Sequence, residues 1–433
     1  MNYGLIGEKL GHSFSVPIHN AFGNPDYVLK EIPREELAAF IEAGDFKGLN
    51  VTIPYKQDVM PFCILDEAAA QIGAVNTLVK KDGKIYGYNT DAFGLSSMMD
   101  RSYGAEDVDL TEKHAVILGA GGTAKTALYV LKKKHIASVT VLARDVKKAE
   151  ESIRSGEGGE NASGIPVTFE SITNPSEEVC NRTDIIVNTT PVGMFPKADA
   201  VPIALSLFPN VSAVFDVIYN PLTTKFIAEA KKRNLISANG LYMLVMQAYR
   251  AELLFGLEPV SDGRKVFEDL KNRLENTVLI GMPGSGKTTI GKLLAEKSGK
   301  QFIDTDEEFA KTYGITPGEC IKTEGEDAFR QKETEVVRSV AAKTGCIIAT
   351  GGGVVTRPVN IEVLKQNGTI VYLKRDIRNL SSEGRPLSQG NGAIEKLFEV
   401  RSPLYESAAD YIADVAEGDL TKTLETVWKK VKE

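Results

Sequence analysis

The chain has 433 residues, of which 42% are hydrophobic and 25% charged, so it is long enough for two to four folded domains and too apolar for a disordered protein. Its 58 acidic residues exceed its 51 lysines and arginines, which gives a net charge of -7 with no long run of either sign. We therefore expect neither nucleic acid nor an anionic membrane as a partner, because both require a concentrated basic surface.

Cysteine usage and the first residues indicate the compartment. The four cysteines, Cys63, Cys180, Cys320 and Cys346, are widely spaced and form no CxxC pair, which argues against structural zinc and for a reducing environment. The opening stretch "MNYGLIGEKLGHS" lacks a basic region followed by an apolar one, and no apolar run approaches the ~18 residues of a membrane span. We expect a cytoplasmic protein with small-molecule substrates, and a homo-oligomer is possible.

Residues 1–100 alternate short strand-like runs with helical ones, which predicts an α/β domain. "NVTIPYK" is predicted to end a strand at Lys56, and "GYNTD" another at Asp91. Asp82-Gly83, between two arms of alternating apolar residues, predicts a hairpin. A solvated strand end is the simpler alternative for Lys56, since lysines are mostly exposed.

From His114, strands and helices alternate strictly, which predicts a parallel, doubly wound sheet over residues 101–235. Its first strand leads into "GAGGTAKTA", where Gly119, Gly121 and Ala124 follow the pattern G-x-G-x-x-A. The loop opens a helix whose first N–H groups favour a phosphate. The pattern predicts a Rossmann-like dinucleotide domain, with a purely structural glycine turn as the alternative.

The end of the next strand, "VTVLARD", is where a dinucleotide-binding protein contacts the adenosine ribose. Arg144 would hold the 2′-phosphate of NADP, whereas an acid there would favour NAD. We therefore expect NADP(H) as cofactor, and the neighbouring Asp145 keeps NAD open. An arginine that is merely solvated is the simpler alternative for Arg144.

A helical segment over residues 239–256 follows, and then Pro259 and Gly263 interrupt the apolar periodicity. We expect residues 236–260 to belong with the first α/β domain. Residues 261–276 are predicted to form a linker, and strand–helix alternation restarts over residues 277–433.

The segment "GMPGSGKT" follows the phosphate-loop pattern G-x-x-x-x-G-K-[ST], between the apolar strand "TVLI" and the helix "TIGKLLAEK". Its backbone N–H groups would surround the phosphates of ATP, Lys287 would reach the β and γ groups, and Thr288 would ligate Mg²⁺. The predicted ATP-binding residues are Gly284, Ser285, Gly286, Lys287, Thr288 and Thr289.

Residues beyond this loop indicate the phosphate acceptor. An acid suits a hydroxyl, and the forked guanidinium of arginine suits a carboxylate, so the set predicts a small polyhydroxylated acid. The candidates, in chain order, are Asp304, Asp306, Arg330, Glu333, Gly351, Gly352, Gly353, Arg385 and Arg401.

Residues 1 to about 260 resemble shikimate dehydrogenase, whose motifs occur here in order as "GEKLGHSFSVPIHN", "NVTIPYK", "GAVNTL", "GYNTDAFG", "GAGGTAKTA", "NTTPVGM", "DVIYNP" and "GLYMLVMQA". The resemblance implies Lys56 and Asp91 as the catalytic pair, and Ser13 and Ser15 as ligands of the substrate carboxylate. It implies substrate contacts at Thr52, Asn76, Tyr219 and Gln247, and cofactor contacts at Gly119, Gly121, Gly122, Thr123, Ala124, Arg144, Thr190, Met194, Gly240 and Met243.

Three positions depart from the family pattern. Val16 stands where proline is usual, Ala92 where glycine is usual, and Ala143 where asparagine is usual, and the last weakens the preference for NADP. Simpler roles are a helix cap at Ser15, a hydrogen-bonded turn at Asn76, and packing at Tyr219, Met194 and Met243.

Residues 277 to about 430 resemble shikimate kinase in the same ordered set of motifs. The resemblance implies that Asp306 binds ring hydroxyls and accepts the proton of the attacking one, and that Asp304 holds Mg²⁺ through water. It also implies a carboxylate site at Arg330, Gly352, Gly353 and Arg401, and a lid in "SSEGRPLSQGNGA" that carries Arg385. The arginine that contacts adenine is Arg375 or Arg378.

Together the two resemblances imply an enzyme that reduces 3-dehydroshikimate with NADPH and phosphorylates the product with MgATP. One alternative is an NAD-linked quinate or shikimate dehydrogenase in the first half. Another is a half retained as a non-catalytic metabolite-binding module, and a third is a phosphate-loop kinase for a different hydroxyl compound.

Overall fold

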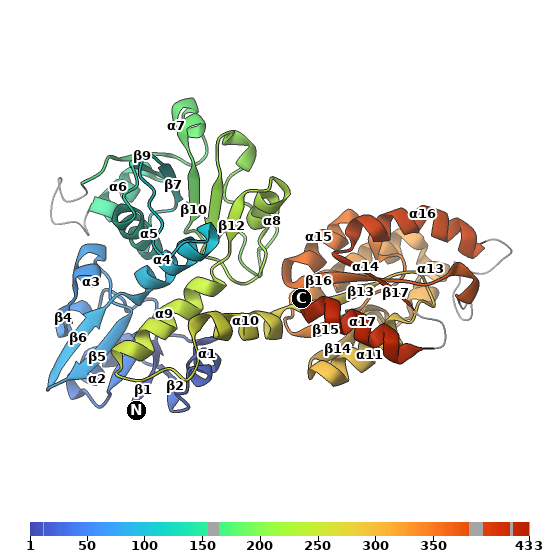
Figure 1. Ribbon diagram of the computed structural model, residues 1–433, viewed down its shortest axis with the longest axis horizontal. Helices are drawn as coiled ribbons and strands as arrows, with labels where there is room; N and C mark the ends of the chain where they lie inside the picture. Colours follow the sequence, from blue (N-terminus) through green and yellow to red (C-terminus); the bar gives the residue numbers. More distant parts are fainter. Residues whose placement is uncertain (12, 155–163, 381–392, 416–418, 433) are drawn as a thin grey trace. The chain divides into compact units, whose positions relative to one another are not determined.

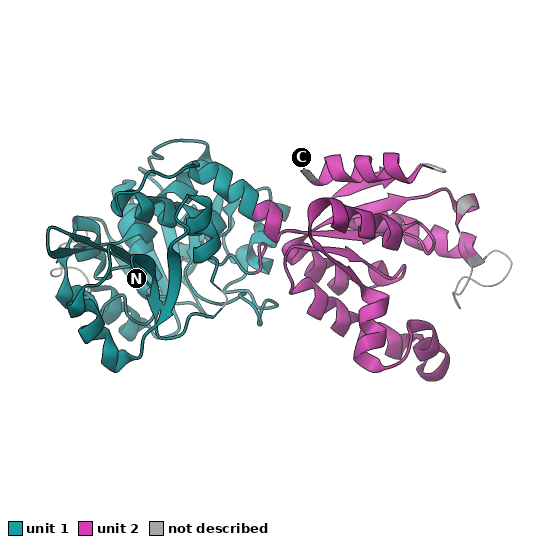
Figure 2. Ribbon diagram, turned by 90° about the horizontal axis from the view of Figure 1, so that it is seen from below, with its two compact units in different colours: residues 1–220, 224–270 teal, residues 221–223, 271–433 magenta. Residues whose placement is uncertain are grey.

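The computed structural model describes residues 1–11, 13–154, 164–380, 393–415 and 419–432. The chain divides into two compact units, coloured separately in Figure 2: unit 1 contains residues 1–220 and 224–270, and unit 2 contains residues 221–223 and 271–433. None of the described helices has the length and apolar character that a membrane crossing needs.

Unit 1 begins with a mixed six-stranded sheet, sheet A, in the order β2-β1-β3-β5-β6-β4. The strands are β1 (Tyr3–Gly7), β2 (Tyr27–Glu31), β3 (Gly48–Val51), β4 (Ile64–Leu65), β5 (Thr77–Lys81) and β6 (Lys84–Tyr88). The hairpin predicted at Asp82-Gly83 is confirmed, since it joins the antiparallel strands β5 and β6 and both residues have positive φ. Helices α1 (Ser15–Ala21), α2 (Leu37–Ala43) and α3 (Glu67–Ile72) connect the strands.

The second sheet of unit 1, sheet B, is parallel throughout, with the order β12-β11-β10-β7-β8-β9. This order is that of a doubly wound dinucleotide-binding sheet, which confirms the predicted architecture. Its strands are β7 (His114–Leu118), β8 (Ser138–Ala143), β9 (Val167–Ser171), β10 (Ile185–Asn188), β11 (Ala213–Asp216) and β12 (Ile236–Ala238). Its helices are α5 (Gly122–Lys133), α6 (Val146–Arg154), α7 (Glu177–Arg182) and α8 (Lys225–Lys232).

Two helices, α4 (Thr90–Tyr103) and α9 (Leu241–Leu254), pack against each other between sheets A and B (Figure 1). Gly94 allows the close approach, because a Cβ there would lie 2.4 Å from the carbonyl oxygen of Met243. The helix predicted over 239–256 is confirmed as α9. The two sheets of unit 1 are therefore joined by one tightly packed helix pair.

Unit 2 contains a parallel five-stranded sheet, sheet C, in the order β14-β15-β13-β16-β17. Apolar clusters cover both of its faces. The strands are β13 (Asn276–Ile280), β14 (Gln301–Asp304), β15 (Cys346–Ala349), β16 (Gly368–Lys374) and β17 (Tyr411–Asp414). The helices are α11 (Lys287–Ser298), α12 (Thr305–Tyr313), α13 (Pro317–Glu324), α14 (Glu326–Ala341), α15 (Pro358–Asn367), α16 (Ala393–Ala408) and α17 (Leu420–Lys432). The segment predicted as a linker, 261–276, holds α10 (Gly263–Leu274).

Two predicted strand ends are wrong. β3 ends at Val51, so Lys56 lies in the turns that follow it, because Pro54 has no N–H to continue a sheet ladder. β6 ends at Tyr88, because the side chain of Asn89 accepts the Ala92 N–H and starts α4 there. Asp91 is therefore the second residue of a helix.

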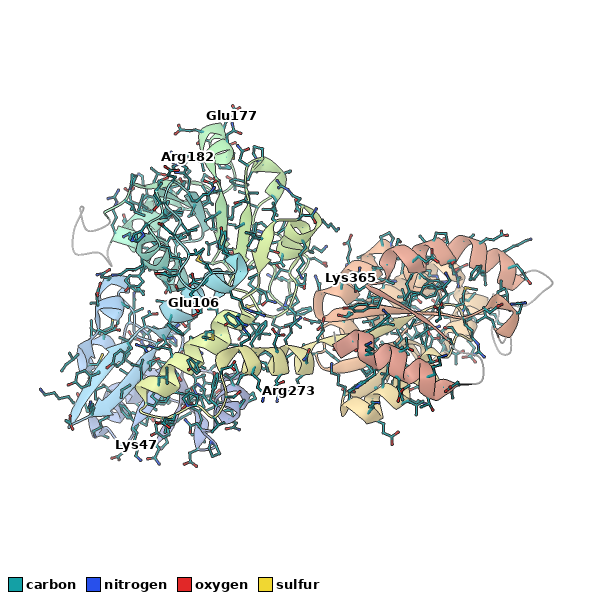
Figure 3. The ribbon with its side chains drawn as sticks, in the orientation of Figure 1. Lys47, Glu106, Glu177, Arg182, Arg273 and Lys365 are labelled. Atoms are coloured by element: carbon teal, nitrogen blue, oxygen red, sulfur yellow. The ribbon has the colours of Figure 1, made fainter. Side chains whose placement is uncertain are left out.

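Charged side chains lie on the outside of both units (Figure 3). Lys47, Glu106 and Glu177 are exposed in unit 1, and Lys365 of α15 pairs with Asp410 at 3.0 Å in unit 2. Exposed pairs of this kind add ~1 kcal/mol at most, so the fold depends mainly on the buried faces of the three sheets.

One buried carboxyl sits at the end of sheet B. Asp216 accepts hydrogen bonds from Asn188 Nδ2 at 3.0 Å, from the Ile218 amide at 3.1 Å and from Thr224 Oγ1 at 2.7 Å. Burial raises the pKa of Asp216 to about 6, although these three donors act in the opposite direction. Through these hydrogen bonds the Asp216 carboxyl connects β10, β11 and α8. Because its pKa is raised, it also makes the stability of the fold depend on pH.

Asp216→Asn should remove a pH dependence of unfolding. The carboxyl has a pKa of about 6 in the folded chain and of 3.8 in the unfolded chain. Protonation of Asp216 therefore gives its full contribution to the free energy of unfolding below pH 3.8. That contribution is lost as the pH rises through 6, by about 3 kcal/mol at most. Denaturant unfolding of unit 1 between about pH 4 and pH 8 should show this decline in the native chain and not in the variant. Parallel pH profiles would contradict the raised pKa.

Candidate active sites

The first predicted pair is in direct contact. Lys56 Nζ donates a hydrogen bond to Asp91 Oδ2 at 2.5 Å, and the two side chains are 28% and 19% exposed. Asp91 lies in the first turn of α4, where the helix dipole favours a negative charge. The structure thus holds an ammonium and a carboxylate together at a position that solvent and a small ligand can reach.

Thr90, the residue before Asp91, connects this pair to two further polar side chains, those of Asn76 and Gln247. Asn76 Oδ1 accepts the Thr90 amide hydrogen at 2.7 Å, and Asn76 Nδ2 donates to Thr90 Oγ1 at 3.0 Å. Thr90 Oγ1 also bonds to Gln247 Oε1 at 3.4 Å. The structure therefore brings Asn76 and Gln247 together with the Lys56–Asp91 pair. Thr90 was not predicted, although it stands between polar residues of "GYNTD".

The two predicted serines form a second small group. Ser13 Oγ donates to Ser15 Oγ at 3.1 Å, and the Ser15 amide donates to Ser13 Oγ at 3.2 Å. No side-chain cap occurs on α1, so Ser15 is not the helix cap of the simpler alternative. The Tyr219 ring lies 5.9 Å from the ring of Phe14, the residue between the serines. Among the described contacts, none joins these hydroxyls directly to Lys56 or Asp91.

Thr52 lies directly after β3, and its amide donates to the Ile6 carbonyl at 3.0 Å. It precedes Lys56 by one turn of irregular chain and is half-buried. Its placement keeps a hydroxyl on the sheet A side of the site.

The first glycine loop lies where sheet B changes direction, between β7 and β10. Gly119 has a φ of 96°, and a Cβ there would lie 2.9 Å from Thr190 Cγ2, so glycine is required. A Cβ at Gly121 or Gly122 would meet nothing within 4 Å, and no side chain caps α5. The N-terminal amides of α5, which include Thr123, thus face open space that fits a pyrophosphate, while Ala124 is buried.

The remaining predicted cofactor residues differ in exposure. Arg144 is exposed after β8, whereas the neighbouring Asp145 accepts the Lys148 amide at 3.1 Å as a helix cap. Met194 is 44% exposed, but Met243 belongs to the apolar core, as the packing alternative expected. A Cβ at Gly240 would lie 2.0 Å from the Val217 carbonyl oxygen, so glycine there is needed for packing in any case.

The phosphate loop of unit 2 connects β13 to α11 and lines a cavity of about 720 Å³. No side chain caps α11, and Gly286 before it has a φ of 97°. Lys287 Nζ donates to the carbonyls of Gly281 and Met282, both at 2.9 Å. Ser285 Oγ is buried and has no hydrogen-bond partner among the described residues, which fits a phosphate oxygen. Gly284, Thr288 and Thr289 also line the cavity.

The predicted metal ligands are in contact. Thr288 Oγ1 donates to Asp304 Oδ2 at 2.9 Å, and Asp304 Oδ1 accepts the amide of Asp306 at 3.0 Å. Within the described residues, no cluster of three or more His, Cys, Asp or Glu side chains forms a metal site. One hydroxyl and one carboxylate beside a phosphate loop still fit Mg²⁺, which is usually held by few protein oxygens together with phosphates and waters.

Two arginines of unit 2, Arg330 and Arg401, contact the glycine loop after β15. Arg330 is buried and pairs with Glu333 at 2.8 Å and with Glu326 at 2.9 Å. Arg401 Nη1 donates to the Gly352 carbonyl at 3.3 Å. A Cβ at Gly353 would lie 2.2 Å from Arg330 Nη2, and one at Gly351 would lie 2.8 Å from Asp306 Oδ1. These glycines allow the arginine and the aspartate to approach the loop.

The charged side chains of this cluster change one another's pKa values. Burial alone would lower the pKa of Arg330, but Glu333 and Glu326 outweigh it and raise the pKa. Burial raises the pKa of the Glu333 carboxyl, although Arg330, Arg401 and Arg357 act in the opposite direction. Arg330 thus stays charged within the buried cluster.

The sequence did not indicate Tyr405 as a site residue. Its hydroxyl donates to the Gly352 carbonyl, the same oxygen that Arg401 contacts. Its position one helical turn after Arg401, in "RSPLYE", was the available signal.

Three predicted arginines remain. Arg385 lies outside the described residues. Arg375 Nη1 donates to the Gly284 carbonyl at 3.2 Å and lines the cavity, whereas Arg378 is 84% exposed and pairs with Asp376 at 2.6 Å. Of the two arginines left open for adenine, Arg375 is the one that touches the phosphate loop.

Comparisons with known proteins cover both units. Family models match residues 5–78, as the shikimate dehydrogenase substrate binding domain, and residues 283–432, as shikimate kinase. A shikimate dehydrogenase (NADP(+)) from Clostridium beijerinckii is 37% identical over 260 residues, which are 58% of this chain and 90% of that protein. A chorismate mutase/shikimate 5-dehydrogenase fusion protein from Clostridium acetobutylicum is similar in structure, with a TM-score of 0.54, 34% identity, and coverage of 62% of this chain and 96% of that one. Quinate dehydrogenase from Corynebacterium glutamicum in complex with NAD has a TM-score of 0.54, 29% identity, and coverage of 62% and 98%.

Proposed function

The chain belongs to the shikimate dehydrogenase family and carries a shikimate kinase domain, and we propose that it reduces 3-dehydroshikimate to shikimate with NADPH and then phosphorylates shikimate with MgATP. The observation that carries the proposal is that unit 1 and unit 2 each contain a glycine-rich nucleotide loop and a separate set of polar side chains, Lys56 with Asp91 in unit 1 and the cavity around Lys287 in unit 2. The domain ranges that we propose are 1–100 with 236–260 for dehydrogenase substrate, 101–235 for NADP, 261–276 as linker and 277–433 for the kinase.

In the reductase site, Lys56 is proposed as the proton donor. Reduction of a ketone leaves an alkoxide, and the Lys56 side chain can protonate it while Asp91 holds the amine in place. NADPH, when bound, supplies the hydride. Asn76, Gln247, Thr52 and Tyr219 are proposed to bind the ring oxygens, and Ser13 and Ser15 the carboxylate.

NADP is proposed over NAD because of two neighbouring side chains. Arg144 is exposed where a 2′-phosphate would lie, whereas Asp145 already caps α6 through the Lys148 amide. The similarity to a quinate dehydrogenase in complex with NAD supports the alternative of an NAD-linked quinate or shikimate dehydrogenase. Comparing kcat/KM for the two nucleotides distinguishes these cofactors.

In the kinase site, Asp306 is proposed to bind the ring hydroxyl and accept its proton. Arg330, Arg401, Gly352 and Gly353 are proposed to bind the carboxylate, with charge-assisted hydrogen bonds from the guanidinium groups. Lys287 and the loop amides would bind the phosphates, and Arg385 would approach them from a lid. Mg²⁺ would be held by Thr288 and, through water, by Asp304, and when bound it neutralises phosphate charge.

The proposed function is tested by supplying 3-dehydroshikimate, NADPH and MgATP together. Oxidation of NADPH should precede formation of a phosphorylated acid. Omitting ATP should leave the reduction intact, and omitting NADPH should leave phosphorylation of added shikimate intact. A purified chain that consumes neither nucleotide in the presence of these acids would exclude the proposal, and one that consumes only one would leave the other half as a binding module.

Substitutions in the two sites should act on one reaction each. Lys56→Ala should lower reductase kcat/KM by roughly 10²- to 10⁴-fold, and Asp306→Asn should do the same to the kinase, since each removes a proton-transfer group. Each variant's other activity, measured on the same sample, is the control for folding. Full reductase turnover in Lys56→Ala would remove that lysine from its role.

Gly353→Ala should weaken acid binding in the kinase site. The added methyl would lie 2.2 Å from Arg330 Nη2, and the guanidinium is held by two ion pairs, so it must move. We expect the KM for shikimate to rise about tenfold, because a charge-assisted contact is lost, with the KM for ATP nearly unchanged. An unaltered KM for shikimate would show that Arg330 does not bind the acid.

A further inference from the structure

A chain of buried hydrogen bonds leads to Asn76 from β2 and β3, the two strands of sheet A on either side of β1. Tyr27 on β2 bonds through its hydroxyl to Asn50 Oδ1 at 2.7 Å, and Asn50 Nδ2 on β3 donates to Thr77 Oγ1 at 3.0 Å. Thr77, the first residue of β5, then donates to Asn76 Oδ1 at 3.1 Å. The four side chains therefore form one continuous relay.

The orientations of the Asn50 and Asn76 amides follow from atoms that can act in only one way. Asn50 Nδ2 also reaches the Asn76 carbonyl at 3.4 Å, and a carbonyl only accepts, so the Asn50 amide orientation is fixed. Thr77 Oγ1 accepts from Asn50, so its own hydrogen is available to Asn76 Oδ1 at 3.1 Å, with Thr90 Oγ1, also at 3.1 Å, as the second oxygen in reach. The Thr90 amide, which only donates, bonds to the same Oδ1 at 2.7 Å.

These constraints determine what Asn76 can offer a ligand. Its Oδ1 is used by Thr77 and Thr90, and one hydrogen of its Nδ2 is used by Thr90 Oγ1 at 3.0 Å. The second Nδ2 hydrogen is the remaining polar group. A ligand at Asn76 must therefore present an oxygen that accepts a hydrogen bond.

The side chains of this relay are buried. Tyr27 is 1% exposed, Asn50 5% and Thr77 0%, so Thr77 cannot touch a ligand in the described structure, whereas Asn76 is 3% exposed and keeps one Nδ2 hydrogen for a ligand. A buried network of this kind holds one side-chain orientation, because any rotation would leave further buried polar groups unpaired.

The geometry points to Thr77 as a positioning residue of the reductase: with Asn50 and Tyr27 behind it, Thr77 holds the Asn76 amide so that its N–H meets an oxygen acceptor on the substrate ring. This inference rests on the proposed reduction of 3-dehydroshikimate. It adds a set of residues that act only through Asn76, and it fixes the hydrogen-bond polarity of that subsite.

Thr77→Val tests the inference, because valine keeps the shape of threonine and lacks the hydroxyl. We expect the KM for 3-dehydroshikimate to rise about tenfold, with kcat changed less than about threefold and the KM for NADPH unchanged, since a loosened Asn76 weakens substrate binding. Thr77→Ser restores the hydroxyl and should restore most of the affinity.

Thr183→Val is the matched control. Thr183 is 1% exposed in unit 1, and among the described residues its hydroxyl donates to the Val179 carbonyl alone, at 2.6 Å, so its loss should lower stability without raising the KM. An equal KM for Thr77→Val and Thr183→Val, or a Thr77→Ser variant as impaired as Thr77→Val, would overturn the inference while leaving the proposed function intact. Absence of any reduction by the native chain would instead overturn the proposed function, and the inference with it.

Discussion

The hydrogen bond from the Thr90 amide to the Asn76 side chain positions the Lys56–Asp91 pair of unit 1. It joins the start of β5 to the start of α4, and the next residue of that helix is Asp91, which contacts Lys56. Unit 2 uses a related arrangement with different atoms. The Gly351 amide donates to Thr305 Oγ1 at 3.0 Å at the start of α12, and the next residue is Asp306. In each unit, a threonine at a helix start is hydrogen-bonded to a residue that lies just outside a strand, before β5 in unit 1 and after β15 in unit 2, and the next residue of the helix is the aspartate.

Polar groups buried in this way are stabilising only when they are all paired. An unpaired buried donor or acceptor costs ~1–3 kcal/mol, so the network around Asn76 is expected to adopt one arrangement or to be strongly disfavoured. The cluster around Arg330 follows the same rule with charges, because Glu333 and Glu326 compensate the buried guanidinium. Both sites are therefore organised before any ligand binds, which reduces the ordering cost of binding.

The sequence predicted the parts of the fold that depend on local pattern. Apolar strands before glycine loops located β7 and β13, and the Asp82-Gly83 turn located the β5–β6 hairpin. The predicted strand ends at Lys56 and Asp91 were wrong. Pro54 and the Asn89 cap end the strands earlier through their effect on backbone hydrogen bonds, which the hydrophobic pattern does not reveal. Contacts between distant segments, such as Tyr405 with the Gly352 carbonyl, depend on the fold, and the sequence offered for Tyr405 only its position one helical turn after Arg401. Thr77 illustrates the same limit, since the sequence does not distinguish a buried strand threonine that positions a neighbour from one that merely packs.

The two units present different groups for the same proposed carboxylate, and the difference has a kinetic consequence. Ser13 and Ser15 are neutral hydroxyls, whereas Arg330 and Arg401 are cations, which add ion pairing and a forked donor geometry to each contact with a carboxylate. If both sets bind the acid as proposed, the reductase holds its product more weakly than the kinase holds the same molecule as substrate. Release from the first site and capture by the second would then follow from the ligands alone. Fusion within one chain would add local concentration to this gradient, without requiring a channel between the sites.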